Sequence, residues 1–277
     1  MRKTFKDDTI QKSFEAKGYA VIDFLSADDV NSLEKMYYDN RVDEQKFIEV
    51  TLWNNNYELN KKISEVTGEI ISSKLKNVLD DHIALYSGYV TKIPGRPNAA
   101  KLHQDPLLVD EDNFRSVNVW SPLCEVDENN GAFYVVEGTH NLFRGNRGYT
   151  YFKYEFDDIK DEVIARFGKM VDVHPGQGVI YDHSLLHYSF DNRTDKIRIA
   201  NTCFMIPSEV QPRYFHHNRS GNTLDLYEID SHFMLTYFSA LSAGDLERPL
   251  ISRSDYVPTN KVSIKEFEEL LNNRVTI

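Results

Sequence analysis

Two segments of the chain carry the residues that could do chemistry. In the first, Lys101-Leu-His-Gln-Asp-Pro106, His103 and Asp105 stand two positions apart. Residues i and i+2 of an extended strand point to the same face, so this imidazole and this carboxylate could reach one metal ion. The second segment, residues 178–192, contains two further histidines, His183 and His187. Either histidine could complete a site with three ligands.

Two histidines and one carboxylate on one side of a metal, with the opposite positions open, are the donor set of non-haem Fe(II) oxygenases. The pair His183 and His187 also has the H-x-x-x-H spacing of a helical zinc site. That motif needs a Glu after the first histidine and a helix beneath it. Here Ser184 follows His183, and residues 178–181 are typical of a strand, so the zinc interpretation is poor.

Ser189 and Arg198 make His187 the preferred third ligand, because both follow it closely. Arg198 lies in a predicted apolar strand, where a guanidinium group is costly unless it meets an anion. Guanidinium geometry suits bidentate binding of a carboxylate, and Ser189 could add a hydroxyl donor. These residues predict a dicarboxylate cosubstrate. The structural alternative is an ion pair between Arg198 and one of the many acidic residues of the chain.

Length and composition bound the kind of protein. The chain has 277 residues, 41% hydrophobic and 12% aromatic, which suits one folded domain with a substantial core. A formal net charge of −11 argues against a nucleic-acid or membrane partner, because both need clustered Lys and Arg. Residues 1–8 are charged and lead into no apolar run, so we expect no signal peptide. With only Cys124 and Cys203, the simplest compartment is a reducing cytoplasm.

The elements that must position the candidate residues fall into three stretches of one predicted domain, 1–277. We expect residues 1–81 to be a mainly helical N-terminal support and residues 82–220 to be a β core. Residues 138–167 have poor periodicity and many aromatic residues, and we interpret them as a lid. We interpret residues 221–277 as a C-terminal helical extension. The sequence carries no signal for a particular oligomeric state.

Hydrophobic periodicity supports this division. The predicted helices cover residues 8–17, 27–38, 59–79, 230–241 and 263–272. The predicted strands cover residues 18–25, 83–93, 116–121, 132–136, 170–173, 178–181, 197–205 and 213–216. Short strands separated by polar turns favour a β-sandwich or barrel over a parallel α/β sheet. The expected fold class is therefore mainly β with flanking α-helices.

Together these residues resemble the phytanoyl-CoA dioxygenase (PhyH) family of Fe(II)/2-oxoglutarate oxygenases. The likeness is carried by residues 18–22, 103–105, 120–123, 129–140 and 176–198. It implies a double-stranded β-helix core, a jelly roll of the cupin kind. It also implies that His103, Asp105 and His187 bind Fe(II), and that Ser189 and Arg198 bind 2-oxoglutarate. Residues 138–167 and everything after Pro207 depart from the family pattern, and substrate choice is expected to lie there.

The resemblance further implies a dioxygenase that consumes 2-oxoglutarate and O2 and releases succinate and CO2. Asp105 favours hydroxylation of an unactivated C–H bond, because related halogenases have a small residue at that position. Desaturation, cyclisation and epimerisation stay open. The expected substrate is a small metabolite, either an amino acid or a natural-product intermediate, because the acidic chain lacks a basic patch for a CoA thioester. The candidate substrate contacts are Trp120, Arg144, Arg147 and Tyr149.

Two other kinds of protein remain alternatives. One is a non-catalytic β-barrel that binds a small ligand or a metal. The other is a metal-dependent isomerase or hydrolase of cupin type, which would use the histidines without Arg198. The joint presence of His103, Asp105, His187 and Arg198 favours the oxygenase, because a pure binding protein need not keep iron ligands together with a cosubstrate anchor.

Overall fold

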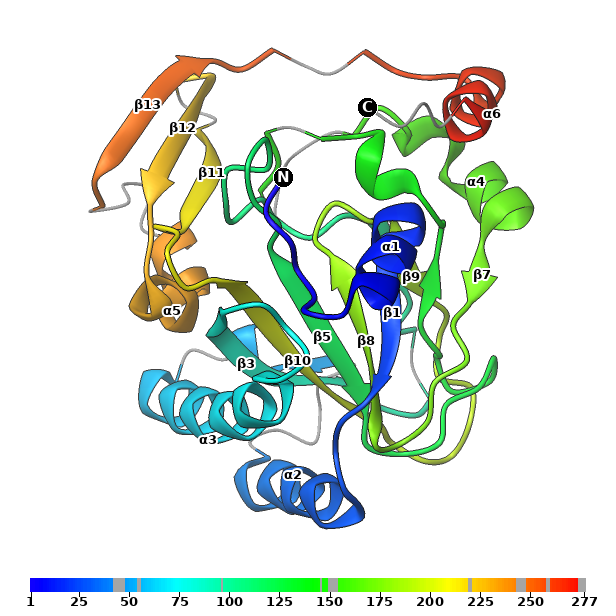
Figure 1. Cartoon of the computed structure of the whole chain (residues 1–277), viewed down its shortest axis with the longest axis vertical. Helices are drawn as coiled ribbons and strands as arrows, with labels where there is room; N and C mark the ends of the chain where they lie inside the picture. Colours follow the sequence, from blue (N-terminus) through cyan, green and yellow to red (C-terminus); the bar gives the residue numbers. More distant parts are fainter. Residues whose placement is uncertain are drawn as a thin grey trace.

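A computed structural model gives the structure of residues 1–41, 48–53, 56–95, 97–144, 146–148, 154–218, 221–242, 248–257 and 260–273. Its largest element is a six-stranded antiparallel sheet with the order β1-β8-β5-β10-β3-β2 (Figure 1). The strands are β1 (Tyr19–Asp23), β8 (Gln177–Asp182), β5 (Val117–Pro122), β10 (Arg198–Pro207), β3 (His82–Lys92) and β2 (Ile48–Val50).

Two smaller antiparallel sheets complete the β structure. The four-stranded sheet has the order β4-β9-β6-β7, and the three-stranded sheet has the order β11-β12-β13. Their strands are β4 (Ala100–His103), β9 (His187–Ser189), β6 (Tyr134–Val135), β7 (Lys169–Met170), β11 (Arg213–Asn218), β12 (Thr223–Glu228) and β13 (Leu250–Asp255). The predicted fold class, mainly β with flanking helices, is confirmed.

Helices cover the outside of these sheets. The α-helices are α1 (Asp8–Lys17), α2 (Ala27–Asn40), α3 (Tyr57–Leu75), α4 (Lys160–Phe167), α5 (Ser231–Ser242) and α6 (Ile264–Asn272). Three short 3-10 helices are η1 (Thr51–Trp53), η2 (Thr139–Asn141) and η3 (Asp157–Ile159). A capping box starts α2, in which the Ser26 side chain accepts from the Asp29 N–H and the Asp29 carboxylate accepts from the Ser26 N–H. No helix among the described residues is long and apolar enough to cross a membrane.

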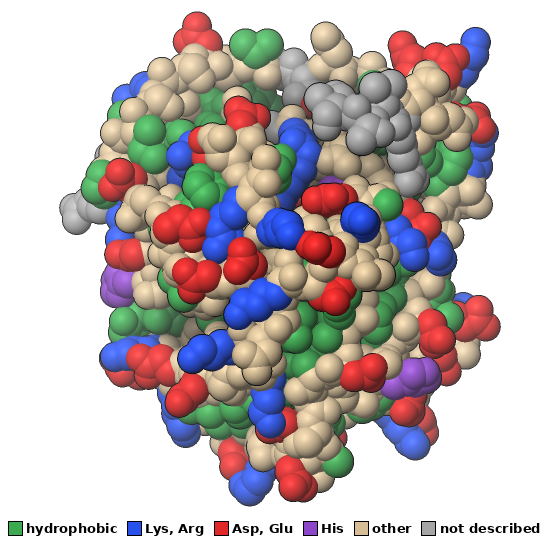
Figure 2. Space-filling model, in the orientation of Figure 1, with side chains coloured by type: hydrophobic (Ala, Val, Ile, Leu, Met, Phe, Trp, Pro, Cys, Tyr) green, Lys and Arg blue, Asp and Glu red, His purple; other side chains and the backbone are tan. Residues whose placement is uncertain are grey.

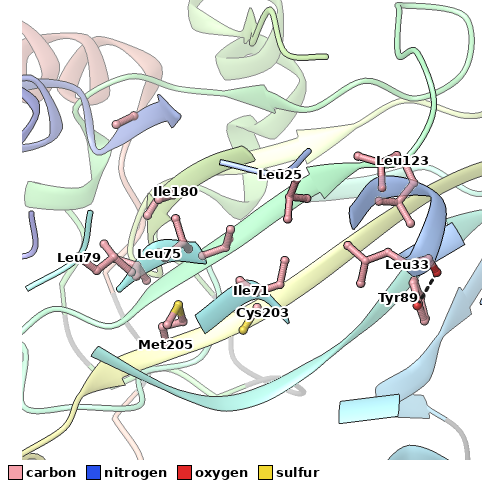
Figure 3. Close-up of a cluster of buried hydrophobic side chains, with 14 of the residues drawn as sticks. Leu25, Leu33, Ile71, Leu75, Leu79, Tyr89, Leu123, Ile180, Cys203 and Met205 are labelled. Atoms are coloured by element: carbon pink, nitrogen blue, oxygen red, sulfur yellow. Dashed lines mark hydrogen bonds between the residues drawn. The ribbon is translucent and has the colours of Figure 1, made fainter. Parts of the chain in front are cut away.

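The outer face of the six-stranded sheet packs against α2 and α3. Leu33 of α2 and Ile71 of α3 meet Cys203 of β10 and Ile180 of β8 in one buried cluster (Figure 3). The Tyr89 hydroxyl closes the contact by donating to the Leu33 carbonyl at 2.7 Å. Because side chains alternate along a strand, the neighbours of these strand residues must point to the other face.

The inner face of the same sheet packs against the four-stranded sheet. Trp120 of β5, Val179 of β8 and Ala200 of β10 share a buried cluster with Phe133 and with Val135 of β6. The two sheets therefore form the layers of a jelly roll, with α2 and α3 outside the larger sheet and α4 and α6 in a cluster with strands of the smaller one. The space between the layers is where the candidate residues lie.

Two stretches differ in detail from the sequence prediction. Residues 138–167, expected as a lid without regular structure, contain η2, η3 and α4. Residues 221–277, expected to be a helical extension, also contain β12 and β13, so that expectation was wrong for these strands. The alternation of Leu224 and Leu226 with polar neighbours is the period-two pattern that marks β12.

The C-terminal helix α6 packs on the predicted lid, in a cluster that also contains Leu102 of β4 and Tyr188 of β9. Phe267 of α6 is buried, and its ring stacks on that of Phe143 with centroids 5.6 Å apart. It shares this cluster with Val163 of α4, and α6 lies beside α4 in Figure 1. On the face shown in Figure 2, Lys and Arg are interspersed with Asp and Glu.

Gly18, between α1 and β1, provides a test of how closely the backbone there packs against His140 and Leu185. Its φ of +87° is left-handed, and a Cβ would lie 2.6 Å from His140 Nδ1 and 2.8 Å from Leu185 Cδ1. Gly95 is a matched control, because its φ is +80° but a Cβ there would meet nothing within 4 Å. Both Ala variants carry a left-handed cost of about 1–2 kcal/mol. We expect Gly18→Ala to lose about 1–3 kcal/mol more through overpacking, measured by urea unfolding. Equal losses in the two variants would contradict the packing described.

Candidate functional site

One pair of strands brings two of the candidate histidines together. β4 pairs with β9, and His103 is the register partner of His187, with ring centroids 4.2 Å apart. Asp105 lies just beyond the end of β4. One potential ligand atom from each of His103, Asp105 and His187 lies within 4.8 Å of the other two. Within the described ranges, no other group of three or more His, Cys, Asp or Glu side chains is arranged in this way.

Backbone carbonyls fix the orientation of both imidazole rings. His103 Nδ1 lies 2.6 Å from the Lys101 carbonyl oxygen, and His187 Nδ1 lies 2.9 Å from the Leu185 carbonyl oxygen. A carbonyl can only accept, so Nδ1 carries the proton in each ring and Nε2 keeps its lone pair. Metal-bound histidines usually make such a contact with the nitrogen that does not bind the metal. Both rings are therefore prepared to offer Nε2 as a ligand.

Burial and nearby charge give His187 and Asp105 the protonation states that a metal needs. Burial, with a further contribution from His103, lowers the pKa of His187 to about 3. Burial also opposes ionisation of Asp105, but His187, His183, His103 and the Asn118 amide together hold the pKa of Asp105 below its usual value. Neutral imidazole and ionised carboxylate are the forms that bind metals. Two nitrogen donors and one carboxylate fit a divalent metal such as Fe(II).

His183, the other histidine considered from the sequence, positions the loop after β4. Its Nδ1 lies 3.1 Å from the Pro106 carbonyl oxygen, and its own carbonyl accepts from the Asp105 N–H at 2.9 Å. The Gln104 side chain donates to the Ser184 carbonyl at 2.5 Å. These hydrogen bonds tie residues 104–106 to the turn between β8 and β9. The segment that contains Asp105 is thus held on both sides of the carboxylate.

Arg198, at the start of β10, is buried without an acidic partner among the described residues. Arg198 is only 2% exposed, and burial lowers the pKa of its guanidinium group to about 10. One terminal nitrogen, Nη1, donates to the Val90 carbonyl at 2.8 Å, whereas Nε has no hydrogen-bond partner. Among the described residues, Arg198 therefore does not form the ion pair with an acidic side chain that was the alternative to binding a cosubstrate. A buried guanidinium with unused donors fits a carboxylate ligand.

Arg198 and the three-residue cluster line one cavity of about 380 Å³. Ser189 also lines it, from the same strand as His187. Trp120 lies in the wall, with the Arg198 guanidinium 5.5 Å from its ring centroid. Aromatic and aliphatic side chains form other parts of the wall, among them Leu52, Tyr86, Leu102, Phe133, Tyr154, Tyr188 and Phe204. The cavity is therefore polar around the cluster, Ser189 and Arg198, carries Lys101 and Lys160 in its lining, and is apolar over much of the remaining wall.

Two of the residues expected to contact substrate are placed elsewhere. Arg147 is 2% exposed, pairs with Glu111 at 2.7 Å and donates from Nε to the Asp105 carbonyl at 2.8 Å. Arg144 is exposed and donates to the Asn141 side chain. Neither arginine lines the cavity. A buried guanidinium needs an acid, and Glu111 supplies it for Arg147. Tyr149 lies outside the described residues.

Sequence reasoning missed two polar residues that contact Asp105. The Asn118 amide of β5 and the Tyr181 hydroxyl of β8 both donate to its Oδ2, at 3.1 Å and 2.9 Å. Part of this signal was present in the sequence, because Asn118 stands between Val117 and Val119 in a predicted strand. A polar residue in a buried strand requires a partner. The pattern alone does not say which partner that is.

Several solved structures share this fold. The carbocyclase SnoK from nogalamycin biosynthesis, described as non-heme and alpha-ketoglutarate-dependent, matches with a TM-score of 0.55 and 18% identity over 89% of this chain and 96% of SnoK. The epimerase SnoN, solved with Fe3+, alpha-ketoglutarate and nogalamycin RO, matches with a TM-score of 0.52 and 12% identity over 75% of this chain and 85% of SnoN.

A third structure is EctD from S. alaskensis, solved with 2-oxoglutarate and 5-hydroxyectoine. It matches with a TM-score of 0.51 and 17% identity over 74% of this chain and 78% of EctD. At these identities the likenesses establish the fold. No curated protein sequence matches the chain.

The family model described as phytanoyl-CoA dioxygenase (PhyH) matches residues 14–200. This match spans more than half of the chain, and it runs from α1 through both sheets of the jelly roll to the start of β10. It therefore contains every residue of the cluster and its neighbour Arg198. The chain belongs to the phytanoyl-CoA dioxygenase (PhyH) family of Fe(II)- and 2-oxoglutarate-dependent oxygenases.

Proposed function

We propose that this oxygenase hydroxylates an unactivated C–H bond of a small molecule, with release of succinate and CO2. One observation carries the proposal: the buried Arg198, which has no acidic partner among the described residues, shares a cavity with His103, Asp105 and His187. A pure metal-binding barrel has no use for such a cation. A dicarboxylate that reaches from the metal to the guanidinium uses both features at once.

In this proposal His103, Asp105 and His187 hold Fe(II), each through one donor atom. The iron, once bound, supplies the oxidative chemistry with O2 and 2-oxoglutarate. Arg198 binds the far carboxylate of 2-oxoglutarate through its free donors, and Ser189 adds a hydroxyl. Trp120 keeps the guanidinium in place by packing against it. The apolar walls of the cavity exclude water and orient the bond that is oxidised.

Asp105 is the residue that favours hydroxylation over halogenation, because its carboxylate occupies the place that a halide would need. The fold itself does not choose among the other outcomes, since a carbocyclase and an epimerase share it. A cavity of about 380 Å³ that also takes 2-oxoglutarate leaves room for a small substrate only. Its aromatic and aliphatic walls favour a natural-product intermediate with an apolar body over a polar amino acid.

The whole chain acts as one catalytic domain in this account. β1, from the N-terminal part, lies in the same sheet as β5, β8 and β10. At the other end, Phe267 of α6 packs on Phe143 in the stretch predicted to be a lid. We propose that α6 supports residues 138–167 beside the substrate part of the cavity.

Removing a metal ligand tests the proposal directly. Anaerobic protein loaded with Fe(II) and 2-oxoglutarate should release succinate when O2 is admitted. His187→Ala should lose stoichiometric Fe(II) binding and lower succinate release by more than about 100-fold, beyond the 10–100-fold typical of residues outside the ligand set. His174→Ala is the control, because the ring of that exposed histidine pairs with Glu125 and Asp172 on the surface. Normal iron binding by His187→Ala would show the ligand assignment to be wrong.

Arg198 should affect the cosubstrate and not the metal. Arg198→Met keeps much of the volume but removes charged hydrogen bonds worth about 1.5–3 kcal/mol, so the KM for 2-oxoglutarate should rise about 10–100-fold. Fe(II) affinity measured without 2-oxoglutarate should stay unchanged. Arg193→Ala, at an exposed arginine that contacts Glu128 and Asn129, is the matched control. An unchanged KM in Arg198→Met would exclude Arg198 as the anchor.

A further inference from the structure

A chain of hydrogen bonds reaches Asp105 from three neighbouring strands of the six-stranded sheet. Thr202 lies on β10, Asn118 on β5 and Tyr181 on β8, and all three are at most 4% exposed. Asn118 is the register partner of Tyr181, and β10 pairs with β5 on the other side. The three side chains belong to the inner face of the sheet, since Val119, Ile180 and Cys203 next to them pack in the cluster against α2 and α3.

The donors and acceptors in this chain can be assigned one direction, in which the Tyr181 hydroxyl donates to the nearer acceptor, Asp105 Oδ2 at 2.9 Å, and not to His187 Nε2 at 3.4 Å. The Thr202 hydroxyl donates to Asn118 Oδ1 at 2.7 Å, which turns the amide nitrogen toward Asp105. That nitrogen donates to the Tyr181 hydroxyl oxygen at 2.7 Å and to Asp105 Oδ2 at 3.1 Å. Having accepted from Asn118, the Tyr181 hydroxyl donates its own proton to Asp105 Oδ2 at 2.9 Å. Two donors therefore converge on one carboxylate oxygen.

The other oxygen of the same carboxylate faces the histidines. Asp105 Oδ1 lies 3.9 Å from His187 Nε2, and no described residue donates a hydrogen bond to it. The two oxygens of Asp105 thus have different surroundings before any metal is present. Oδ2 accepts two hydrogen bonds from the sheet, whereas Oδ1 faces His187 Nε2.

We propose that Asn118 and Tyr181 are positioning residues that restrict Asp105 to binding the metal through Oδ1 alone, with Thr202 setting the orientation of the Asn118 amide. This inference rests on the proposed metal site. A carboxylate that bound through both oxygens would occupy an additional coordination position. Holding Oδ2 to the sheet keeps that position available for 2-oxoglutarate and O2, and it fixes the carboxylate before the metal arrives.

The test is Fe(II) affinity, measured by anaerobic calorimetry on the full chain without 2-oxoglutarate. Tyr181→Phe removes one donor and should weaken Fe(II) binding about 10–100-fold, the range typical of residues that orient metal ligands. Tyr134→Phe makes the same chemical change at a half-buried tyrosine that stacks on Tyr188, and it should leave the affinity unchanged. The visible absorption of the anaerobic Fe(II)–2-oxoglutarate complex should change in Tyr181→Phe only.

Thr202→Val provides a second variant of nearly equal volume that leaves both donors in place. It frees the Asn118 amide to turn, so Fe(II) affinity should fall by less than in Tyr181→Phe. The double variant should fall by less than the product of the two single effects, because both act on the same oxygen.

Three results would overturn the inference or its basis, and they can be told apart. Wild-type affinity in both Tyr181→Phe and Thr202→Val would show that the network does not position Asp105. Equal weakening in Tyr181→Phe and Tyr134→Phe would show a general loss of structure. If the wild-type chain bound no Fe(II), the proposed function itself would fail, and the role of Asn118 and Tyr181 with it.

Discussion

The pairing of β4 with β9 is the constraint on which the site depends. It sets His103 opposite His187, and both rings are then turned by carbonyls of their own strand segments. Side chains alternate across a strand, so a slip of one residue would send one histidine to the opposite face. The loop after β4 has a second restraint, because Asp105 is held by the backbone of His183 and by the Arg147 side chain. Segments far apart in the sequence thus hold His103, Asp105 and His187 close to one another.

The two faces of the six-stranded sheet have different roles. One packs on helices and stabilises the fold, and the other carries polar residues of the candidate site. Its outer face is largely apolar and packs on α2 and α3, whereas its inner face presents Asn118, Tyr181, Thr202 and Arg198 toward the cavity. Buried polar groups are costly unless they are paired, and most of these pair with one another or with Asp105. Arg198 is the exception, since its Nε has no partner. A cosubstrate carboxylate could accept the hydrogen bond that the Arg198 Nε does not make within the described part of the chain.

Much of this could be predicted from sequence, and the failures have physical causes. The spacing of His103, Asp105, His187 and Arg198 is local in two segments, so it can be read without knowing the fold. The contacts of Asn118 and Tyr181 depend on strand register, which no single sequence displays. Arg147 looked like a substrate contact because a charged aromatic loop gave no hint of its buried partner Glu111. β12 was missed although Leu224 and Leu226 alternate with polar neighbours, and β13 was missed because it is exposed along its whole length and so has no buried face to mark it.

The most direct measurement is a crystal structure of the protein grown anaerobically with Fe(II) and 2-oxoglutarate, with the iron located by anomalous scattering. We expect one iron bound by His103 Nε2, His187 Nε2 and a single oxygen of Asp105, with the far carboxylate of 2-oxoglutarate on Arg198. An iron bound by other residues, or a 2-oxoglutarate that leaves the Arg198 guanidinium without a carboxylate, would contradict this expectation.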